Sequence, residues 1–546
     1  MLDLLIKNGK VVDGTGCPAY RADLAIQDGR ILEISASIEA PARETISAEN
    51  LVASPGFIDM HSHSDFTLLL HPQAESKIRQ GVTTEVVGNC GGSPAPVPDA
   101  HFDDFMDYAT GLGGFYKRVL KPEDWKWKTL SGFWGELGKG GLAVNVVPMV
   151  GHSTLRCHVM GYESREPDPA ELFCMKKLLE TELEAGIFGL STGLIYHPGA
   201  FARREELAEL AKVVKSFDGV YSSHMRSEGK FLFEAVEEAL WVAAQSGAST
   251  QISHLKCETP VRWGTASRLL GMIERAREDG LRVHFDQYPY TAYHCALLEI
   301  FPVADKENGP EQMTRILRDE TLRSGVMEKM KNPPRDWDNP MQGLDWGKVR
   351  LIGFTRKSYR EFEGMTVEEI ARKLALSPLE AVFRVFAEEN GTLGMIVFSM
   401  CEEDICDIMK SPFGMIGSDG SSVAPSGPTA FKSVHPRYYG TFPRVLGRYV
   451  REKKVLSLEE AVRKMTGLPA EKLRLKDRGF LKEGSIADIV LFDAEKVADT
   501  SEFTCPHRFP LGIPYVYVNG RAVISRGEHT GLLPGKVLNR NSDTIR

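Results

Sequence analysis

The chain has 546 residues, 42% hydrophobic and 26% charged, a composition typical of a globular protein and not of a disordered or collagen-like one. Its 66 Lys and Arg against 74 Asp and Glu give a net charge of −8 without a basic block, which argues against a nucleic-acid partner. Nine scattered cysteines, no signal-peptide pattern and no apolar run near the ~18 residues of a membrane span indicate reduced thiols in a cytoplasmic protein with no membrane partner.

The first part of the chain, residues 1–54, alternates short β-type runs with turn signals. Asn8-Gly9, Asp13-Gly14 and Asp28-Gly29 are dipeptides that favour hairpins or tight turns. A similar pattern returns in residues 475–546, around Asn519-Gly520. Two β segments this small are more plausible together than apart, so we expect one small β-sandwich built from both termini.

Residues 55–474 alternate short apolar strands with helical stretches, the pattern of a parallel sheet or barrel. Eight candidate strands begin near residues 56, 83, 143, 189, 220, 250, 282 and 415. We therefore predict the α/β class, with a (β/α)8 TIM barrel flanked by the small β-sandwich domain. The segment from about 296 to 380 is too long for a βα loop and is expected to be an insertion.

Residue types that bind metals follow several of these strands. Imidazole and thiolate groups are good ligands for a divalent transition metal, and barrel enzymes carry their catalytic residues at the carboxyl ends of the strands. The alternative to a metal site is that these are unrelated structural Cys and surface His residues. This alternative becomes implausible because such residues follow so many of the strands. The candidates are His61, His63, Cys90, His224, His254 and Asp419.

Five motifs resemble the amidohydrolase superfamily, and in detail its N-acyl-D-amino acid deacylase (D-aminoacylase) branch. They are Gly-Phe-Ile-Asp-Met-His-Ser-His-Ser-Asp at 56–65, Gly-Val-Thr-Thr-Glu-Val-Val-Gly-Asn-Cys-Gly at 81–91, Ser-Thr-Gly-Leu-Ile-Tyr at 191–196, Asp-Gln-Tyr-Pro-Tyr at 286–290 and His-Pro-Arg-x-x-Gly-Thr-Phe-Pro-Arg at 435–444. The similarity covers nearly the whole chain and is weakest in the insertion and between 100 and 140. It implies a barrel flanked by a β-sandwich made from both termini.

The resemblance also implies a ligand set for Zn²⁺. A tight site maps onto Cys90, His224 and His254, and a weaker second site onto His61, His63 and Asp419. A thiolate and two imidazoles leave one zinc position for water, whose pKa zinc brings to about 7. Asp419 is expected to take the water's proton and pass it to the leaving amine. Alternatively, Cys90 could act as the nucleophile, but a thiolate that is bound to a metal is poorly suited to this role.

The substrate's carboxylate calls for cationic or hydroxyl donors near the metal. The resemblance assigns this role to Lys256, Tyr288 and Arg437, and gives Tyr196 the task of polarising the scissile carbonyl. His294 stands where the branch usually has a Ser that also holds the carboxylate.

Two apolar residues and one loop complete the expected substrate site. Ile195 and Met400 are candidates for an apolar pocket, with a plain core role as the alternative for each. The loop after Asp419 is several residues longer than usual in the branch. Because this loop and His294 both concern substrate binding, the preferred amino acid stays open.

We therefore predict a zinc-dependent hydrolase that cleaves the linear amide of N-acyl-D-amino acids, a small-molecule substrate. One alternative is a cyclic-amide hydrolase of the hydantoinase or dihydroorotase type, which the absence of a Lys at strand four and the presence of Cys90 disfavour. Others are a hydrolase of D-dipeptides or other amides, and a catalytically silent scaffold on the same barrel.

Overall fold

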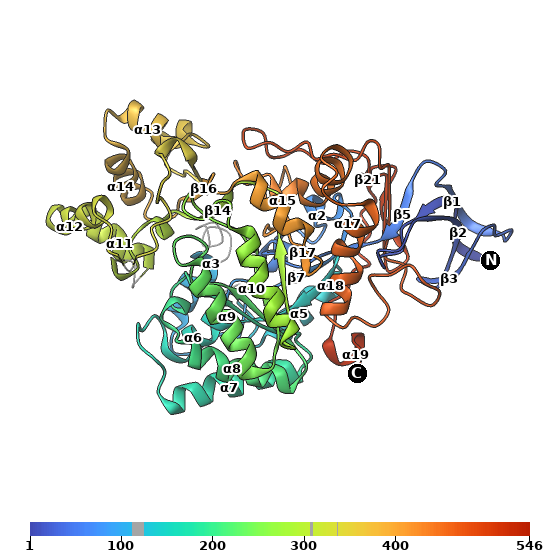
Figure 1. Cartoon of the computed structure of the whole chain (residues 1–546), viewed down its shortest axis with the longest axis horizontal. Coiled ribbons are helices and arrows are strands. Elements are labelled where there is room, and N and C mark those ends of the chain that lie inside the picture. The colour runs from blue at the N-terminus through green and yellow to red at the C-terminus, as the bar shows by residue number, and fades with distance from the viewer. Residues whose placement is uncertain (112–124, 306–308, 336, 546) are drawn as a thin grey trace.

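The computed structural model describes residues 1–111, 125–305, 309–335 and 337–545. Its centre is a barrel of parallel strands (Figure 1). The strands are β6 (Phe57–Asp59), β7 (Val82–Val87), β8 (Asn145–Pro148) continued by β9 (Val150–Gly151), β10 (Gly189–Gly193), β11 (Val220–His224), β12 (Ser249–Ile252), β13 (Val283–Gln287) and β17 (Gly414–Ile416). The barrel closes between its first and last strands, where a parallel bridge joins Ser62 to Gly420 and Asp419 N donates to His61 O at 2.8 Å.

Helices cover the outside of the barrel because each has one apolar face. In α8 (Arg204–Ser216) that face consists of Leu207, Leu210, Ala211 and Val214, all buried. The other covering helices are α6 (His152–Met160), α7 (Pro169–Glu184), α9 (Leu232–Ser246), α10 (Ala266–Glu278), α15 (Glu402–Lys410), α17 (Leu458–Met465) and α18 (Gly467–Lys472). Further helices are α1 (Asp65–Leu70), α2 (Glu75–Ile78), α3 (Phe102–Gly111), α5 (Leu130–Lys139), α16 (Arg437–Arg444) and α19 (Arg540–Asp543). In the part of the chain described, no helix is both long and apolar enough to cross a membrane.

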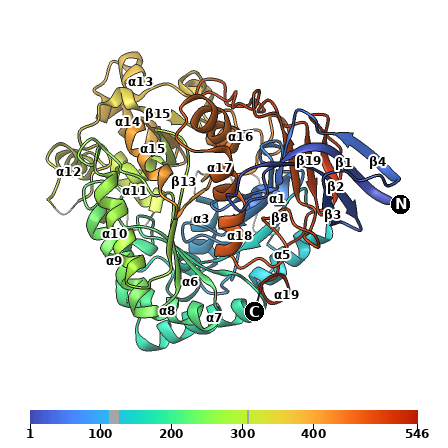
Figure 2. The same ribbon diagram turned by 45° about the vertical axis from the view of Figure 1, so that its right-hand side comes forward.

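Strands from both termini form one continuous sheet at the end of the molecule opposite the insertion (Figure 2). They are β1 (Leu2–Val11), β2 (Tyr20–Gln27), β3 (Arg30–Ser35), β4 (Ala42–Ser47), β5 (Val52–Pro55), β18 (Ile489–Phe492), β19 (Tyr515–Val518), β20 (Arg521–Ser525) and β21 (Glu528–His529). The two halves join through β5 and β18, which pair antiparallel with Ser54 opposite Val490. The predicted fold class, a TIM barrel with a small β domain built from both termini, is confirmed.

A separate α/β unit is inserted between β13 and β17 and has its own hydrophobic core. Its antiparallel sheet has the order β14 (Tyr293–Ala296), β16 (Gly394–Val397), β15 (Val349–Ile352). Its longer helices are α11 (Gly309–Arg318), α12 (Glu320–Lys331), α13 (Val367–Leu374) and α14 (Pro378–Glu388). The unit extends past both ends of the expected range 296–380, because its sheet pairs β14, which begins just before that range, with β16, after it.

Candidate active site

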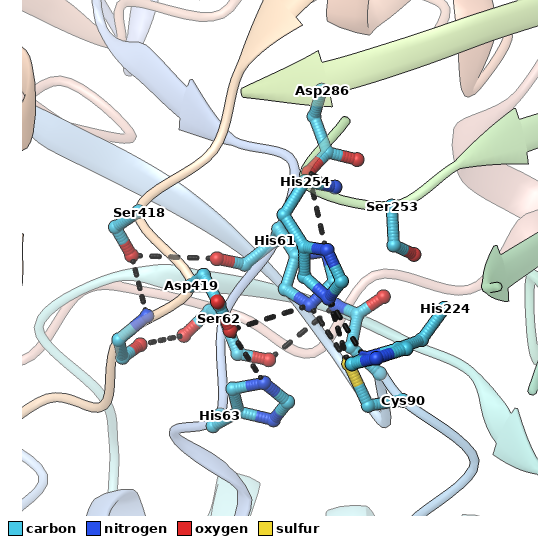
Figure 3. A network of polar contacts seen from close by, with 12 residues as sticks. His61, Ser62, His63, Cys90, His224, Ser253, His254, Asp286, Ser418 and Asp419 are labelled. Atoms are coloured by element: carbon cyan, nitrogen blue, oxygen red, sulfur yellow. Dashed lines mark hydrogen bonds and ion pairs between the residues drawn. The ribbon is translucent and has the colours of Figure 1, made fainter. Parts of the chain in front are cut away.

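Side chains that could bind a metal gather at the carboxyl ends of the barrel strands (Figure 3). His61 and His63 follow β6, Cys90 follows β7, His224 ends β11, His254 follows β12 and Asp419 follows β17. The ligand atoms of His61, Cys90, His254 and Asp419 lie within 4.8 Å of one another, and all four residues are buried. The barrel therefore brings the predicted ligand residues to one mouth, as parallel strands in a closed barrel must.

The ligand atoms make short contacts with one another. Cys90 Sγ lies 3.2 Å from His61 Nε2 and 3.6 Å from His254 Nε2, His254 Nε2 lies 2.9 Å from His224 Nδ1, and His63 Nε2 lies 3.0 Å from Asp419 Oδ1. Cys90 thus contacts ligands of both predicted sites. The assignment of three ligands to a tight site and three to a weaker one stays a prediction.

The backbone at three of these residues has positive φ, which is uncommon for residues other than glycine. The φ angles are 52° at Cys90, 34° at His254 and 49° at Asp419. Such conformations cost about 1–3 kcal/mol each and cluster at functional sites, where they aim side chains that a regular strand would direct elsewhere. Gly91, beside Cys90, also has positive φ, and a Cβ there would lie 2.8 Å from Gly193 N, so the turn has no room for a larger residue.

The charges around Cys90 favour its thiolate. Burial alone would raise the pKa of this thiol, but His61, His224 and His254 lower it well below its usual value. A thiolate with imidazoles is a preferred donor set for Zn²⁺. His224 Nε2 is also buried and, among the described residues, has no hydrogen-bond partner. The residues present therefore fit zinc.

Two buried carboxylates outside the predicted set orient the histidines. Asp286 Oδ1 accepts a hydrogen bond from His254 N at 2.8 Å and lies 3.2 Å from His61 Nδ1. Glu228 Oε1 lies 2.8 Å from His254 Nδ1, and Glu228 Oε2 lies 2.6 Å from Lys256 Nζ. A carboxylate on the second ring nitrogen of a ligating histidine fixes its tautomer and its orientation.

Replacing Glu228 with glutamine is expected to weaken zinc binding by roughly 10- to 100-fold, because His254 loses the partner that fixes its ring. Competition with a metal chelator measures this affinity. Glu238→Gln is the matched control, since Glu238 lines the same cavity but pairs with Arg226 at 3.0 Å. Equal zinc affinity in the Glu228 variant, the control and the wild type would remove Glu228 from this role.

A second buried network, around Lys77 of α2, holds the loops that carry the ligands. Lys77 Nζ lies 2.6 Å from Asp59 Oδ2 and 3.5 Å from Glu85 Oε2, and all three side chains are completely buried. Lys77 also donates to the Gly420 carbonyl at 2.8 Å, and Asp59 accepts from Ser418 N at 2.8 Å. Asp59 and Glu85 raise the pKa of Lys77 although burial opposes them, so the lysine remains charged and ties β6, β7 and the Asp419 loop together.

Lys77→Met is expected to lower the free energy of unfolding by about 3–5 kcal/mol, because it leaves two buried carboxylates without their cation. The midpoint of thermal denaturation measures the change. The control is Lys176→Met, which removes a surface pair with Glu209 at 2.8 Å and should shift the free energy by no more than about 0.5 kcal/mol. If both variants melt at the wild-type temperature, the network does not stabilise the site.

Three residues expected to hold a substrate carboxylate lie together. Arg437 Cζ is 4.8 Å and Lys256 Nζ 5.6 Å from the centre of the Tyr288 ring. The Tyr288 hydroxyl and Arg437 Nε are buried and, within the described part of the chain, make no hydrogen bond. Arg437 Nη1 forms an ion pair with Asp419 Oδ2 at 2.9 Å. The group has unused donors next to the candidate metal centre.

Tyr196 and His294 flank the same centre. The Tyr196 ring lies 5.0 Å from the His224 ring, and burial followed by the Cys90 charge raises the Tyr196 pKa well above its usual value. Its hydroxyl therefore keeps its proton and can donate. Burial and the nearby Arg437 lower the His294 pKa to about 3, so this histidine is neutral; its Nδ1 lies 3.4 Å from the Tyr438 hydroxyl.

A cavity of about 920 Å³ opens from the metal-binding residues and is covered by the inserted unit. It is lined by Ile195, together with insertion residues such as Tyr293, His294 and Trp337. The predicted pocket residue Met400 instead belongs to the main hydrophobic core and does not line the cavity. Its sulfur accepts a hydrogen bond from the adjacent Ser399 hydroxyl at 3.2 Å.

A barrel with buried imidazole, thiolate and carboxylate groups at the carboxyl ends of its strands defines a metal-dependent hydrolase of the TIM-barrel type. The chain belongs to the amidohydrolase family, whose model matches residues 44–332 and 349–524. The resemblance predicted from the sequence is thus confirmed.

Relatives within the family match over almost the full length. The N-acyl-D-glutamate deacylase of Alcaligenes xylosoxydans xylosoxydans is 35% identical over 99% of this chain and 97% of its own. The N-acyl-D-glutamate deacylase of Bordetella bronchiseptica, solved with zinc and a phosphonate inhibitor that mimics the tetrahedral intermediate, has a TM-score of 0.80 and 33% identity, covering 98% of this chain and 99% of its own. A D-aminoacylase, described as having a binuclear metal centre with one-metal activation and second-metal attenuation, has a TM-score of 0.80 and 34% identity over 99% and 100% of the two chains.

Proposed function

We propose that the chain is a zinc-dependent hydrolase that cleaves the linear amide of N-acyl-D-amino acids into a carboxylate and a free D-amino acid. The observation that carries this proposal is the buried group of His61, Cys90, His254 and Asp419, with ligand atoms within 4.8 Å of one another at the mouth of the barrel. The D configuration is supported by relatives named for N-acyl-D-amino acids.

Cys90, His224 and His254 would hold the tight zinc, with His61, His63 and Asp419 available to a second ion. Zinc, when bound, supplies a Lewis acid that polarises the amide carbonyl and lowers the pKa of water. Tyr196 donates its hydroxyl proton to the same carbonyl oxygen in a hydrogen bond. Because the reaction centre is buried, such a donor stabilises developing negative charge more strongly than it would in water.

Asp419 moves the proton that amide cleavage requires. Arg437, His254 and His63 hold the pKa of this carboxyl well below its usual value although burial opposes them, so the carboxylate is available as a base. It takes a proton from the attacking water and delivers it to the amide nitrogen, which then leaves as an amine. Lys256, Tyr288 and Arg437 bind the substrate's carboxylate and so orient the scissile bond.

The proposal extends to a cytoplasmic enzyme acting on a small molecule. No disulfide joins any of the nine cysteines, all of which lie in the described part of the chain, and three of them are exposed, as expected in a reducing compartment.

The zinc-loaded enzyme should be given linear N-acetyl-D-amino acids and, separately, the corresponding D-hydantoins. Release of a free amine from the linear substrates alone is the expected result. Opening of the hydantoin ring without cleavage of the linear amides would replace the proposal with the cyclic-amide alternative.

A further inference from the structure

The substrate cavity has an unusual charge balance. Asp and Glu outnumber Lys and Arg among the residues that line it. Every Lys and Arg of the described lining already faces a carboxylate: Arg204 with Glu205 at 3.1 Å, Arg226 with Glu238 at 3.0 Å, Lys256 with Glu228 at 2.6 Å, Lys329 with Asp305 at 2.6 Å and Arg437 with Asp419 at 2.9 Å. The cavity therefore offers no unpaired cation to a second carboxylate on a substrate.

Glu258 is an acidic residue of this lining that is partly buried. It lies two residues beyond Lys256 and lines the cavity. Within the described residues it forms no ion pair with a basic side chain, and its buried Oε1 has no hydrogen-bond partner. Burial, and then the neighbouring Glu228, raise the pKa of Glu258 to about 8, although Lys256 opposes the shift. The carboxyl group thus lacks a cation.

The position of Glu258 fits a contact with the amino acid's side chain. It lines the same cavity as Lys256 and Arg437 of the proposed carboxylate-binding group and as Tyr293 and Trp337 of the inserted unit. When the α-carboxylate is bound at Lys256 and Arg437, the amino acid's side chain shares this cavity with Glu258.

We propose that Glu258 is a specificity-determining residue that selects N-acyl-D-amino acids with a cationic side chain, such as D-lysine, D-ornithine or D-arginine. This inference rests on the proposed function. An ammonium or guanidinium group supplies the missing cation and forms a charge-assisted hydrogen bond. An acidic side chain would lie beside Glu258 and Glu228 and would find no Lys or Arg free to pair with it, so the site does not favour it. An apolar side chain leaves Glu258 without a cation.

The test compares kcat/KM of the zinc-loaded enzyme for N-acetyl-D-lysine, N-acetyl-D-norleucine and N-acetyl-D-glutamate, measured as amine release. Norleucine keeps the aliphatic chain of lysine and lacks its ammonium group. The wild type should prefer lysine over norleucine by about 10- to 100-fold, the value of one hydrogen bond between charged groups. Glu258→Gln should reduce this ratio to about one while cleaving norleucine at nearly the wild-type rate.

Glu234→Gln is the matched control, because Glu234 is an exposed acid of the same lining and should leave the ratio unchanged. The inference is overturned if the wild type prefers norleucine or glutamate, or if Glu258→Gln keeps the lysine preference. Release from none of the N-acetyl-D-amino acids would overturn the proposed function itself and the inference with it, so the two failures are distinguishable.

The pH dependence gives a second readout. Glu258 faces Glu228, Lys256, Asp338 and Tyr293, and its pKa of about 8 makes the free carboxyl largely neutral at pH 7. Binding of a cation favours the ionised form, so the lysine-to-norleucine ratio should rise as the pH rises through about 8. The ratio should be independent of pH in Glu258→Gln. A ratio that falls with rising pH in the wild type contradicts the proposal.

Discussion

Asp419→Ala is expected to reduce kcat/KM by about 10²- to 10⁴-fold, the usual contribution of a general acid or base, while zinc remains bound at about one ion per chain. The physical reason is that the water and the amide nitrogen lose the group that transfers the proton between them. Asp419 lies 3.0 Å from His63 and 2.9 Å from Arg437, which keep its carboxylate ionised. Zinc analysis of the purified variant, together with its rate of amine release, measures both quantities.

The variant also removes the partner of Arg437, which is almost completely buried, so a loss of stability must be separated from a loss of chemistry. Asp419→Asn keeps the side-chain volume and should be equally inactive. Asp499→Ala serves as a control because it breaks a similar pair, Arg444 with Asp499 at 2.8 Å, outside the described lining of the cavity. Near-normal turnover in Asp419→Ala would contradict the role of Asp419 as the base.

Cys90→Ser is expected to release the tight zinc and with it the activity. The thiolate is the anionic ligand of the proposed tight site, and its loss should weaken zinc binding by at least roughly 100-fold, the upper end of what residues behind the ligands contribute. After dialysis the variant should contain far less than one zinc per chain. Metal analysis and amine release from the same preparation test this result.

Cys257→Ser is the matched control for Cys90. Both thiols are buried, but burial raises the pKa of Cys257 to about 12, whereas neighbouring histidines lower that of Cys90. The control should keep its zinc and its activity. Full zinc content in Cys90→Ser would show that the thiolate does not hold the metal, and would reopen its alternative role as a nucleophile.

The sequence predicts the fold and the gathering of metal-binding residue types at one mouth of the barrel, because both follow from local patterns. Each of His61, Cys90, His224, His254 and Asp419 comes at or just after an apolar strand, and closure of the barrel brings strand ends together whatever lies between them. The family motifs add Tyr196, Tyr288 and Arg437 at positions that the structure places around the same cavity or beside it.

The residues behind the ligands could not be predicted in the same way. Glu228 stands in a polar loop and Lys77 in a short polar helix, where each looks like an exposed charge in the sequence. Their burial depends on partners far along the chain, such as His254 for Glu228 and Gly420 for Lys77. A carboxylate four residues after His224 is a weak signal that could have drawn attention to Glu228.

The inserted unit shows a further limit of sequence reasoning. Its boundaries, at β14 and β16, are set by antiparallel pairing between segments about a hundred residues apart, which no local pattern records. Met400 is a candidate for an apolar pocket in the sequence, with a plain core role as the alternative, and packing places it in the main core.

The most direct test of the proposed function is amine release by the zinc-loaded enzyme from matched N-acetyl-D- and N-acetyl-L-amino acids, with zinc measured in the same sample. We expect at least one zinc per chain and release of the amine from D substrates only. Release from the L substrates instead, or from neither series with zinc fully bound, would contradict it.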